Sequence, residues 1–415
     1  MTTTPQVDVV CLGESMVTFL PGSAGPLADV PSFDRAIGGA ESNVACTLAR
    51  AGHRAAWVGR VGTDGFGDHL VRTIAEHGVD TSAVERDPER PTGIYFRTNG
   101  ERATGAVGAG EGTGATGLVD GTGPAAHPGP LSEVLYYRAG SAASAMSPAN
   151  VPRRVLRAGK VLHLTGITAA LSTDCLALLR ELTSARTPAD RGGGTGPLVS
   201  FDVNYRVGLW RTPTVAERGA EVLRELARHS DLVFVGEDEA AAAWGVTGGP
   251  EAVREALAEP AVLVVKQGAT GATAFTREGT AVFAPALRVD VVSPVGAGDA
   301  FAAGFLAGTL RGLPVDQRLR HGHLTAAAAL TDAGDLAAPP GRDLADRLAA
   351  LDAESWAGLR LGPGWTTHGP RTATAGRPDE PAEPDQSAVP DQPAEPDQPA
   401  RPDQPGRREL EVRSV

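Results

Sequence analysis

Short apolar runs alternate with amphipathic stretches from residue 7 to residue 351 of the chain. Runs rich in Val, Ile and Leu predict buried strands, and apolar residues three or four positions apart predict helices. The expected strands are 7–12, 55–61, 92–97, 133–138, 161–165, a run beginning at Leu198, 231–235, 261–266 and 288–292. The expected helices lie within 37–52, 68–76, 148–158, 173–185, 300–310, 319–330 and 344–351, with another opening at Glu237. This alternation predicts an α/β fold, a mostly parallel central sheet flanked by helices.

Two of the expected strands carry large aromatic residues at alternating positions. These strands, 92–97 and 133–138, flank a stretch from about 103 to 130 that is rich in Gly, Ala and Thr and predicts a flexible insertion. If the two strands pair, they form a small β lid outside the main sheet, from about 14–35 and 92–140. The alternative is that the aromatic side chains only provide half-buried packing.

The composition limits the partners that this chain can have. Its 415 residues carry a net charge of −12 and a pI of about 5.3, which argues against nucleic-acid binding. No apolar run is long enough to span a membrane, no early segment reads as a signal peptide, and the three cysteines lack metal-ligand spacing, so we expect a cytoplasmic protein. Residues 7–352 form one predicted domain. The Pro/Asp/Gln-rich residues 363–415 are predicted to be a disordered tail.

The stretch from Arg288 to Gly312 combines a predicted strand, a glycine turn and a helix. Free N–H groups at the start of such a helix, together with its dipole, favour an anion. The turn at 296–299 also carries the carboxylate of Asp299, which is unfavourable beside an anion unless it collects a proton from a hydroxyl that attacks a phosphate. The alternative is that Asp299 only caps the helix. Neither the P-loop nor the dinucleotide pattern fits this turn.

Two stretches near the amino terminus have residues suited to a ligand. Gly13 and Glu14 follow the first expected strand, and ligands of open α/β sheets bind beyond the carboxyl ends of strands. Gly38 and Gly39 leave the backbone open to a ligand, and Asn43 offers a donor and an acceptor to a sugar hydroxyl. A Gly-Gly turn followed by an Asn cap, with an ordinary turn after the strand, explains the same residues.

Two later strands also end in polar residues. The run from Leu198 delivers Asp202, Asn204 and Arg206 to the edge where sites form, and the guanidinium of Arg206 suits a carboxylate or a phosphate. An arginine on the surface is the equal alternative. The strand at 261–266 ends at Lys266, close to Gly268, and this lysine either reaches a nucleotide phosphate or only ends the strand.

With these motifs together, the chain resembles the ribokinase-like (PfkB) family of carbohydrate kinases over residues 7–352. The sequence GGAESN at 38–43 resembles the amino-terminal signature of that family, and PVGAGDAF at 294–301 resembles its carboxyl-terminal signature. Within the family, the closest resemblance is to the 2-keto-3-deoxygluconate kinases. It rests on GGAESNVA from Gly38, TGIY from Thr92, YYRAGSAAS from Tyr136 and DVNYR from Asp202.

The resemblance implies a role for particular residues. Asp299 is the implied catalytic base, and the implied anion hole consists of Gly296, Ala297 and Gly298. The nucleotide is expected at Lys266, Gly268, Gly296 and Gly298. The residues implied to contact the substrate are Gly13, Gly38, Gly39, Asn43, Tyr95, Tyr136, Arg138 and Arg206.

The implied cofactors are ATP and Mg²⁺, with a monovalent cation as a further candidate. Glu239 is the implied metal residue, because the Asn-x-x-Glu pattern of the family reads Gly236 to Glu239 here and keeps only the glutamate. Ser293 stands where related kinases carry Asp beside the monovalent-cation site. The implied partner is a small sugar or sugar acid, and the family resemblance leads us to expect a homo-oligomer.

The sequence therefore predicts an ATP-dependent kinase that phosphorylates a primary hydroxyl of a sugar acid, with 2-keto-3-deoxygluconate as the expected substrate. A carboxylate in the substrate calls for a cationic fork, which a neutral hexose does not need. Two alternatives stay open. One is a kinase of a neutral sugar such as fructose or ribose, and the other is a non-catalytic sugar-binding regulator on the same fold.

Overall fold

The computed structural model describes residues 7–23, 25–97, 134–184, 196–210, 219–334 and 336–369. All of them belong to one compact unit, residues 1–372. The predicted insertion at 103–130 and the predicted tail beyond residue 369 lie outside the described residues.

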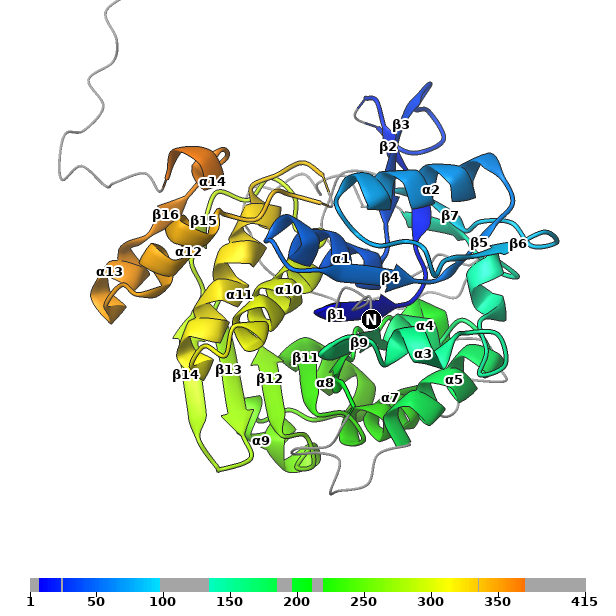
Figure 1. Cartoon of the computed structure of the whole chain (residues 1–415). Coiled ribbons are helices and arrows are strands. Elements are labelled where there is room, and N and C mark those ends of the chain that lie inside the picture. The colour runs from blue at the N-terminus through cyan, green and yellow to red at the C-terminus, as the bar shows by residue number, and fades with distance from the viewer. Residues whose placement is uncertain are drawn as a thin grey trace, which may run out of the picture. The chain divides into compact units, whose positions relative to one another are not determined.

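A large central sheet organises this unit (Figure 1). Its strand order is β14-β13-β12-β11-β10-β9-β1-β4. From β12 to β4 all neighbours are parallel, while β13 and β14 form an antiparallel edge. The prediction of a mostly parallel sheet flanked by helices is confirmed. The strands are β1 (Val9–Leu12), β4 (Ala55–Val58), β9 (Val161–Thr165), β10 (Leu198–Asp202), β11 (Leu232–Gly236), β12 (Val262–Lys266), β13 (Gly271–Thr276) and β14 (Ala281–Pro285).

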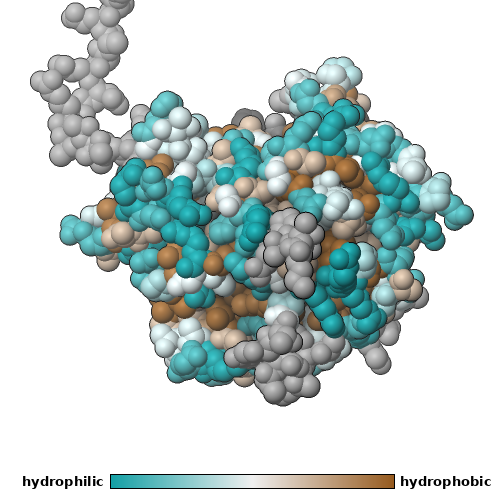
Figure 2. All heavy atoms as spheres, viewed as in Figure 1, coloured by the Kyte–Doolittle hydropathy of each residue, from teal (hydrophilic) through white to brown (hydrophobic). Residues whose placement is uncertain are grey.

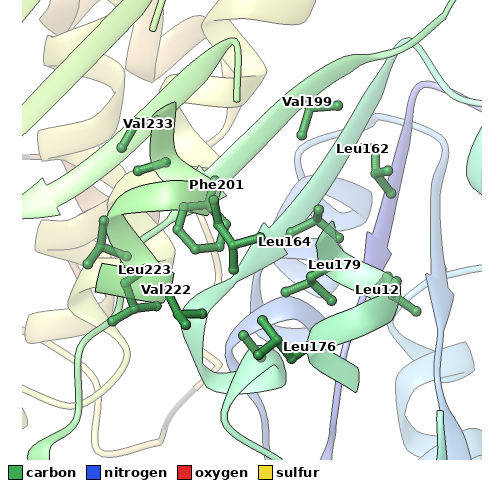
Figure 3. Packing of buried hydrophobic residues seen from close by; sticks show 14 of the residues in the cluster. Leu12, Leu162, Leu164, Leu176, Leu179, Val199, Phe201, Val222, Leu223 and Val233 are labelled. Carbon is green, nitrogen blue, oxygen red and sulfur yellow. The ribbon is translucent and has the colours of Figure 1, made fainter. Parts of the chain in front are cut away.

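Helices cover both faces of this sheet because successive strand residues point to opposite sides. Leu162 and Leu164 of β9 join one apolar cluster, whereas Val161 joins the other. Figure 3 shows the first cluster, in which β9 and β10 pack against leucines of α5 and α7. The α-helices are α1 (Ala40–Arg50), α2 (Gly65–Glu76), α3 (Arg153–Leu156), α4 (Gly166–Ala169), α5 (Thr173–Ser184), α7 (Gly219–Arg228), α8 (Glu237–Trp244), α9 (Gly249–Ala256), α10 (Ala297–Leu310), α11 (Val315–Leu330), α12 (Arg342–Ala349), α13 (Ala353–Gly358) and α14 (Trp365–His368), and the 3-10 helices are η1 (Ala142–Ala145) and η2 (Val207–Trp210).

A separate four-stranded sheet has the order β3-β2-β7-β8. Its strands are β2 (Met16–Pro21), β3 (Phe33–Gly38), β7 (Ile94–Arg97) and β8 (Val134–Tyr137). The two aromatic strands predicted at 92–97 and 133–138 correspond to β7 and β8. They pair antiparallel and so belong to one small sheet outside the main one. Aromatic rings also pack across it, for example Phe19 on Phe96 at 4.8 Å between centroids. That this sheet acts as a lid stays a prediction.

Two expected strands are wrong in extent. Residues 55–61 divide at Gly59 into β4 and β5 (Arg60–Gly62), and β5 pairs instead with β6 (Glu85–Asp87). A β-carbon at Gly59 would lie 2.6 Å from the Trp57 ring, so only glycine allows the chain to turn there. Residues 288–292 form only the short β15 (Arg288–Val289), which pairs with β16 (Arg360–Leu361) outside the main sheet.

Several helix ends differ from expectation. Helix α1 begins at Ala40 after Gly39, so Asn43 lies inside it and does not cap it. Helix α10 begins at Ala297, which places Asp299 in its first turn instead of in a preceding loop. The helix expected at 148–158 is reduced to the single turn of α3.

The ordered chain also continues past the predicted ends at residues 352 and 362. Trp356 of α13 and Trp365 of α14 are buried in a third apolar cluster with Leu324 of α11. Figure 2 shows polar residues over much of one face of the molecule, with apolar residues in smaller groups between them. In the part of the chain that the structure describes, every helix is too short or too polar to span a bilayer.

Candidate active site

The candidate site lies at the carboxyl edge of the main sheet. There the parallel neighbours β1, β9 and β10 end at or just before Gly13, Thr165 and Asp202, which are all buried. The first turn of α1 reaches the same edge, since Glu41 accepts a hydrogen bond from Thr165. The first turn of α10 joins it through Asp299. Ligands of open α/β sheets bind at such an edge.

The pair of Asn43 and Asp299 connects the two predicted signatures. Nδ2 of Asn43 donates a hydrogen bond to Oδ2 of Asp299 at 3.0 Å. Oδ1 of Asn43 is buried and has no donor among the described residues. This contact holds the Asp299 carboxylate at one oxygen, so that its other oxygen can accept a proton.

The start of α10 is suited to an anion beside a base. Gly296 precedes the helix with φ 77°, a left-handed conformation that favours glycine, and no side chain caps the helix. Its first N–H groups therefore lack intrahelical partners. Burial raises the pKa of Asp299 to about 6, and Asp202 raises it too, whereas Asn43, Arg206 and Lys266 lower it. A carboxylate with that pKa is ionised at neutral pH and is still basic enough to collect a proton.

Lys266 carries a positive charge to the same place. Its Nζ donates hydrogen bonds to both carboxylate oxygens of Asp202, at 3.1 and 3.0 Å. A β-carbon added to Gly298 would lie 3.8 Å from this Nζ, so the ammonium lies beside the start of α10. Burial lowers the pKa of Lys266, but the carboxylates of Asp202 and Glu239 outweigh it and raise the pKa above its usual value. The lysine is therefore charged and close to the candidate anion hole.

Arg206 and Glu239 form a second ion pair on the neighbouring strand end. Nη1 of Arg206 lies 3.4 Å from Oε1 of Glu239, while Oε2 of Glu239 accepts the N–H of Gly236 at 2.8 Å. Both oxygens of Glu239 are thus engaged within the protein. Among the described residues, no cluster of three His, Cys, Asp or Glu could hold a metal ion by itself. The metal role of Glu239 stays a prediction.

Glu41 is buried next to the site, against the ends of β1 and β9. Its Oε1 accepts hydrogen bonds from the hydroxyls of Thr165 at 2.7 Å and Thr168 at 2.6 Å, and its Oε2 has no donor among the described residues. The carboxyl group packs against Gly13, where a β-carbon would lie 2.1 Å from it. Burial raises the pKa of Glu41 to about 7, although both threonine hydroxyls lower it. Gly13 is therefore explained by close packing.

The small sheet brings the candidate lid residues together. The rings of Tyr95 and Tyr136 lie 5.5 Å apart, and the guanidinium of Arg138 lies 5.6 Å from the Tyr136 ring centre. Nη2 of Arg138 forms an ion pair with Oε2 of Glu14. Arg138 is thus held against the end of β1, where the sequence also placed Gly13.

The remaining candidate glycines have clear backbone reasons. A β-carbon at Gly39 would lie 2.5 Å from the carbonyl oxygen of Glu14, so the chain passes too closely there for a side chain. Gly38 ends β3 immediately before it. Gly268 is exposed in the turn between β12 and β13 with φ 58°. The ligand contacts predicted for these three glycines stay predictions.

Two carboxylates at the centre of the site, Asp202 and Glu41, have no individual role in the sequence prediction. Asp202 was expected only as part of a polar cluster, but it holds Lys266. Glu41 was not singled out within GGAESN, because an acidic residue in the first turn of a helix is ordinary there. The available signal was the position of Glu41 between Gly39 and Asn43, inside a sequence motif.

Comparison with known proteins agrees with this geometry. The model of the pfkB family carbohydrate kinases matches residues 6–113 and 132–340. A 2-dehydro-3-deoxygluconokinase of Bacillus subtilis (strain 168) is 32% identical over 343 residues, which are 81% of this chain and 94% of that protein. One of Thermoproteus tenax is 34% identical over 326 residues, 78% of this chain and 88% of that protein.

Other matches show a common fold with a wider range of sugars. A probable chloroplastic fructokinase-6 of Arabidopsis thaliana is 28% identical over 322 residues, 75% of this chain and 73% of that protein. The crystal structure of a PfkB protein from Polaromonas sp. JS666 is 30% identical with a TM-score of 0.65, and the match covers 83% of this chain and 100% of that one.

A partly buried carboxylate beside an uncapped helix start and a charged lysine is an arrangement suited to phosphoryl transfer. The chain belongs to the pfkB family of carbohydrate kinases, and it is an ATP-dependent sugar kinase. The resemblance inferred from its two signatures is confirmed.

Proposed function

We propose that this kinase transfers the γ-phosphoryl group of ATP to the primary hydroxyl of 2-keto-3-deoxygluconate, also called 2-dehydro-3-deoxygluconate, and forms the 6-phosphate. The observation that carries this choice is the identity of 32 and 34% to two 2-dehydro-3-deoxygluconokinases, against 28 to 30% to fructokinases. The buried guanidinium of Arg138 at the site edge supports it, since a sugar acid needs such a cationic fork.

Asp299 is the proposed general base of this reaction. The substrate hydroxyl loses its proton to Oδ1 of Asp299 while Asn43 holds Oδ2. The hydroxyl oxygen forms a bond to the γ-phosphorus, the bond from that phosphorus to the bridging oxygen breaks, and ADP leaves with the electron pair. The backbone amides of residues 296–298 receive the charge of the transferring group. Positioned bases typically contribute about a hundred- to ten-thousand-fold.

The nucleotide phosphates are assigned to the start of α10 and Lys266. The lysine charge, next to Gly298, complements the phosphates, while Asp202 fixes the position of the ammonium group. Mg²⁺ bound to the phosphates would neutralise their developing charge, and the residues present fit it because Mg²⁺ in kinases takes only one or two protein carboxylates. The nearby carboxylates are Asp202 at the end of β10 and Glu239 in the first turn of α8, and either would take this role on release of its present partner, Lys266 or Arg206.

Six further substrate contacts complete the proposed site. Gly38, Gly39 and Asn43 would face the sugar from the start of α1, and Tyr95 and Tyr136 from the small sheet. The exposed fraction of the Arg206 side chain is 45%, so this arginine can turn toward a substrate carboxylate. Closure of the small sheet over the sugar would exclude water from the transfer.

A kinase of a neutral sugar is the second candidate, and one observation favours it. Arg138 pairs with Glu14 and Arg206 pairs with Glu239, so both candidate forks already have a carboxylate inside the protein. A fructokinase would tolerate that arrangement. The third alternative is a non-catalytic regulator. The hydrogen bond by which Asn43 positions Asp299 argues against it, since a regulator would not need a positioned base.

Product analysis tests the proposed function. The protein is incubated with ATP, Mg²⁺ and 2-keto-3-deoxygluconate, and the products are followed by phosphorus NMR and by ADP release. We expect one phosphate monoester per ADP, attached at carbon 6. ADP release with fructose or ribose but none with the keto acid would overturn the assignment. A product phosphorylated at another carbon would overturn the placement of Asp299.

A further inference from the structure

Glu14 lies where the main sheet and the small sheet are joined. The chain enters or leaves the small sheet at four crossings: residues 13–15, Gly39, residues 88–93, which come from the two-stranded β5-β6 sheet, and residues 138–141. Glu14 belongs to the first crossing. Its carbonyl oxygen packs on Gly39 of the second, a β-carbon at Gly93 of the third would lie 3.0 Å from its Oε1, and its carboxylate contacts the fourth. All four crossings therefore meet at this residue.

Both carboxylate oxygens of Glu14 bind the fourth crossing. Oε1 accepts a hydrogen bond from Oγ of Ser141 at 2.8 Å, and Oε2 forms the ion pair with Nη2 of Arg138. The side chain of Glu14 is only 1% exposed. A buried charge with this degree of enclosure fixes the position of its partner, because moving the partner away would leave the carboxylate unpaired.

Arg138 still has one donor, its Nε, that none of the described residues uses. Its side chain is 10% exposed, and its Nε finds no acceptor within the described part of the chain. Buried guanidinium N–H groups are almost always hydrogen-bonded in proteins. The unused donor therefore calls for an acceptor beyond the described residues, and a carboxylate is the acceptor that matches a guanidinium best.

We propose that Glu14 is a positioning residue for acid recognition. It holds one edge of the Arg138 guanidinium at the junction of the two sheets and leaves the Nε donor for the carboxylate of the substrate. This inference rests on the proposed function. It differs from two other roles that Glu14 can have: a purely structural hinge contact, and a competitor that occupies Arg138 at the expense of the substrate.

The test compares KM values for 2-keto-3-deoxygluconate and fructose in the wild type and in Glu14→Gln. Glutamine fits both partners, because its carbonyl oxygen can accept from Arg138 and its amide can donate to the hydroxyl of Ser141. The charge that fixes Arg138 is lost. We expect the KM for the keto acid to rise about tenfold or more, the KM for fructose to stay within about twofold, and kcat to change little.

A double-mutant cycle makes the assignment specific. If Glu14 acts through Arg138, Glu14→Gln has no further effect on the KM for the keto acid once Arg138→Leu is present. Ser141→Ala is a second variant, which loosens the same carboxylate without removing its charge, and should produce a smaller rise selective for the acid. Glu225→Gln is the matched control, since it breaks an arginine pair with Arg180 between α5 and α7 and should leave both KM values unchanged.

Each other outcome has a definite meaning. A KM for the keto acid that falls in Glu14→Gln identifies Glu14 as a competitor and overturns the inference. Equal rises for both sugars, with earlier melting in both Glu14→Gln and Ser141→Ala, identify a hinge contact and overturn it too. A wild type that phosphorylates fructose but not the keto acid overturns the proposed function, and with it this inference.

Discussion

Asn43 and Asp299 are 256 positions apart in the chain, yet the amide of the first donates to the carboxylate of the second at 3.0 Å. Each residue lies in the first turn of a helix, and the two helices α1 and α10 pack against each other. The contact brings the two sequence signatures, residues 38–43 and 294–301, together at one candidate site. The same hydrogen bond lowers the pKa of Asp299, the proposed base.

Replacing Asp299 by Asn should abolish most phosphoryl transfer. The amide keeps the shape of the side chain but cannot accept the hydroxyl proton, so kcat should fall about a hundred- to ten-thousand-fold. The measurement is ADP release at saturating substrates, with ATP affinity and melting temperature as controls for folding. Turnover within a few-fold of the wild type in a folded variant would remove Asp299 from the role of base.

The pH profile of kcat should report the titration of Asp299. Burial holds its pKa at about 6, and only the ionised form can take a proton, so kcat should fall as the pH drops through about 6. Asn43 lowers this pKa by its hydrogen bond. In Asn43→Ala the acid limb should therefore move to higher pH. An unchanged limb in that variant would mean that another group controls the profile.

Glu41→Gln should stabilise the protein at alkaline pH. The pKa of Glu41 is about 7 in the folded chain and about 4.5 in an unfolded one, so the raised value contributes stability below pH 4.5 that is lost as the pH rises through 7. At pH 8 the buried charge costs about 3 kcal/mol, which the neutral glutamine avoids. Threonine donors still meet its carbonyl oxygen. The melting temperature of Glu41→Gln relative to wild type should rise from pH 5 to pH 8, and a pH-independent difference would contradict this.

Two truncations should separate the end of the folded core from the tail. Trp365 is 2% exposed in the cluster with Trp356, so a stop after Gly362 removes a buried aromatic residue and should lower the melting temperature. A stop after Gly369 removes only Pro/Asp/Gln-rich sequence, which lacks the apolar residues needed to offset ordering, and should change neither stability nor turnover. Equal melting temperatures for the two truncated chains would contradict the role of Trp365.

The sequence was informative where function depends on local pattern. The glycine turn before Asp299 predicted an uncapped helix start because only glycine adopts the left-handed conformation of Gly296 at no cost. The strand ends at Gly13 and Asp202 followed from apolar runs and the rule for parallel sheets. These two patterns located the edge at which the site lies.

Other features depended on contacts between distant segments. Nothing near Glu41 shows that hydroxyls of Thr165 and Thr168 will bury it. Val291 and Val292 have the β-branched character of a buried strand, but both are more than half exposed and lie outside any strand. Residue type alone could not show that Glu41 is buried or that Val291 and Val292 are exposed. Burial depends on which distant segment packs against a residue.

The specificity ratio between two sugars tests the central claim most directly. The quantity is kcat/KM for 2-keto-3-deoxygluconate divided by that for fructose, measured with ATP and Mg²⁺ in one preparation. One charge-assisted contact to the substrate carboxylate is worth roughly 1.5–3 kcal/mol, so the account predicts a ratio of at least about ten, and more if both Arg138 and Arg206 engage it. A ratio of one or below would contradict it and identify a neutral-sugar kinase.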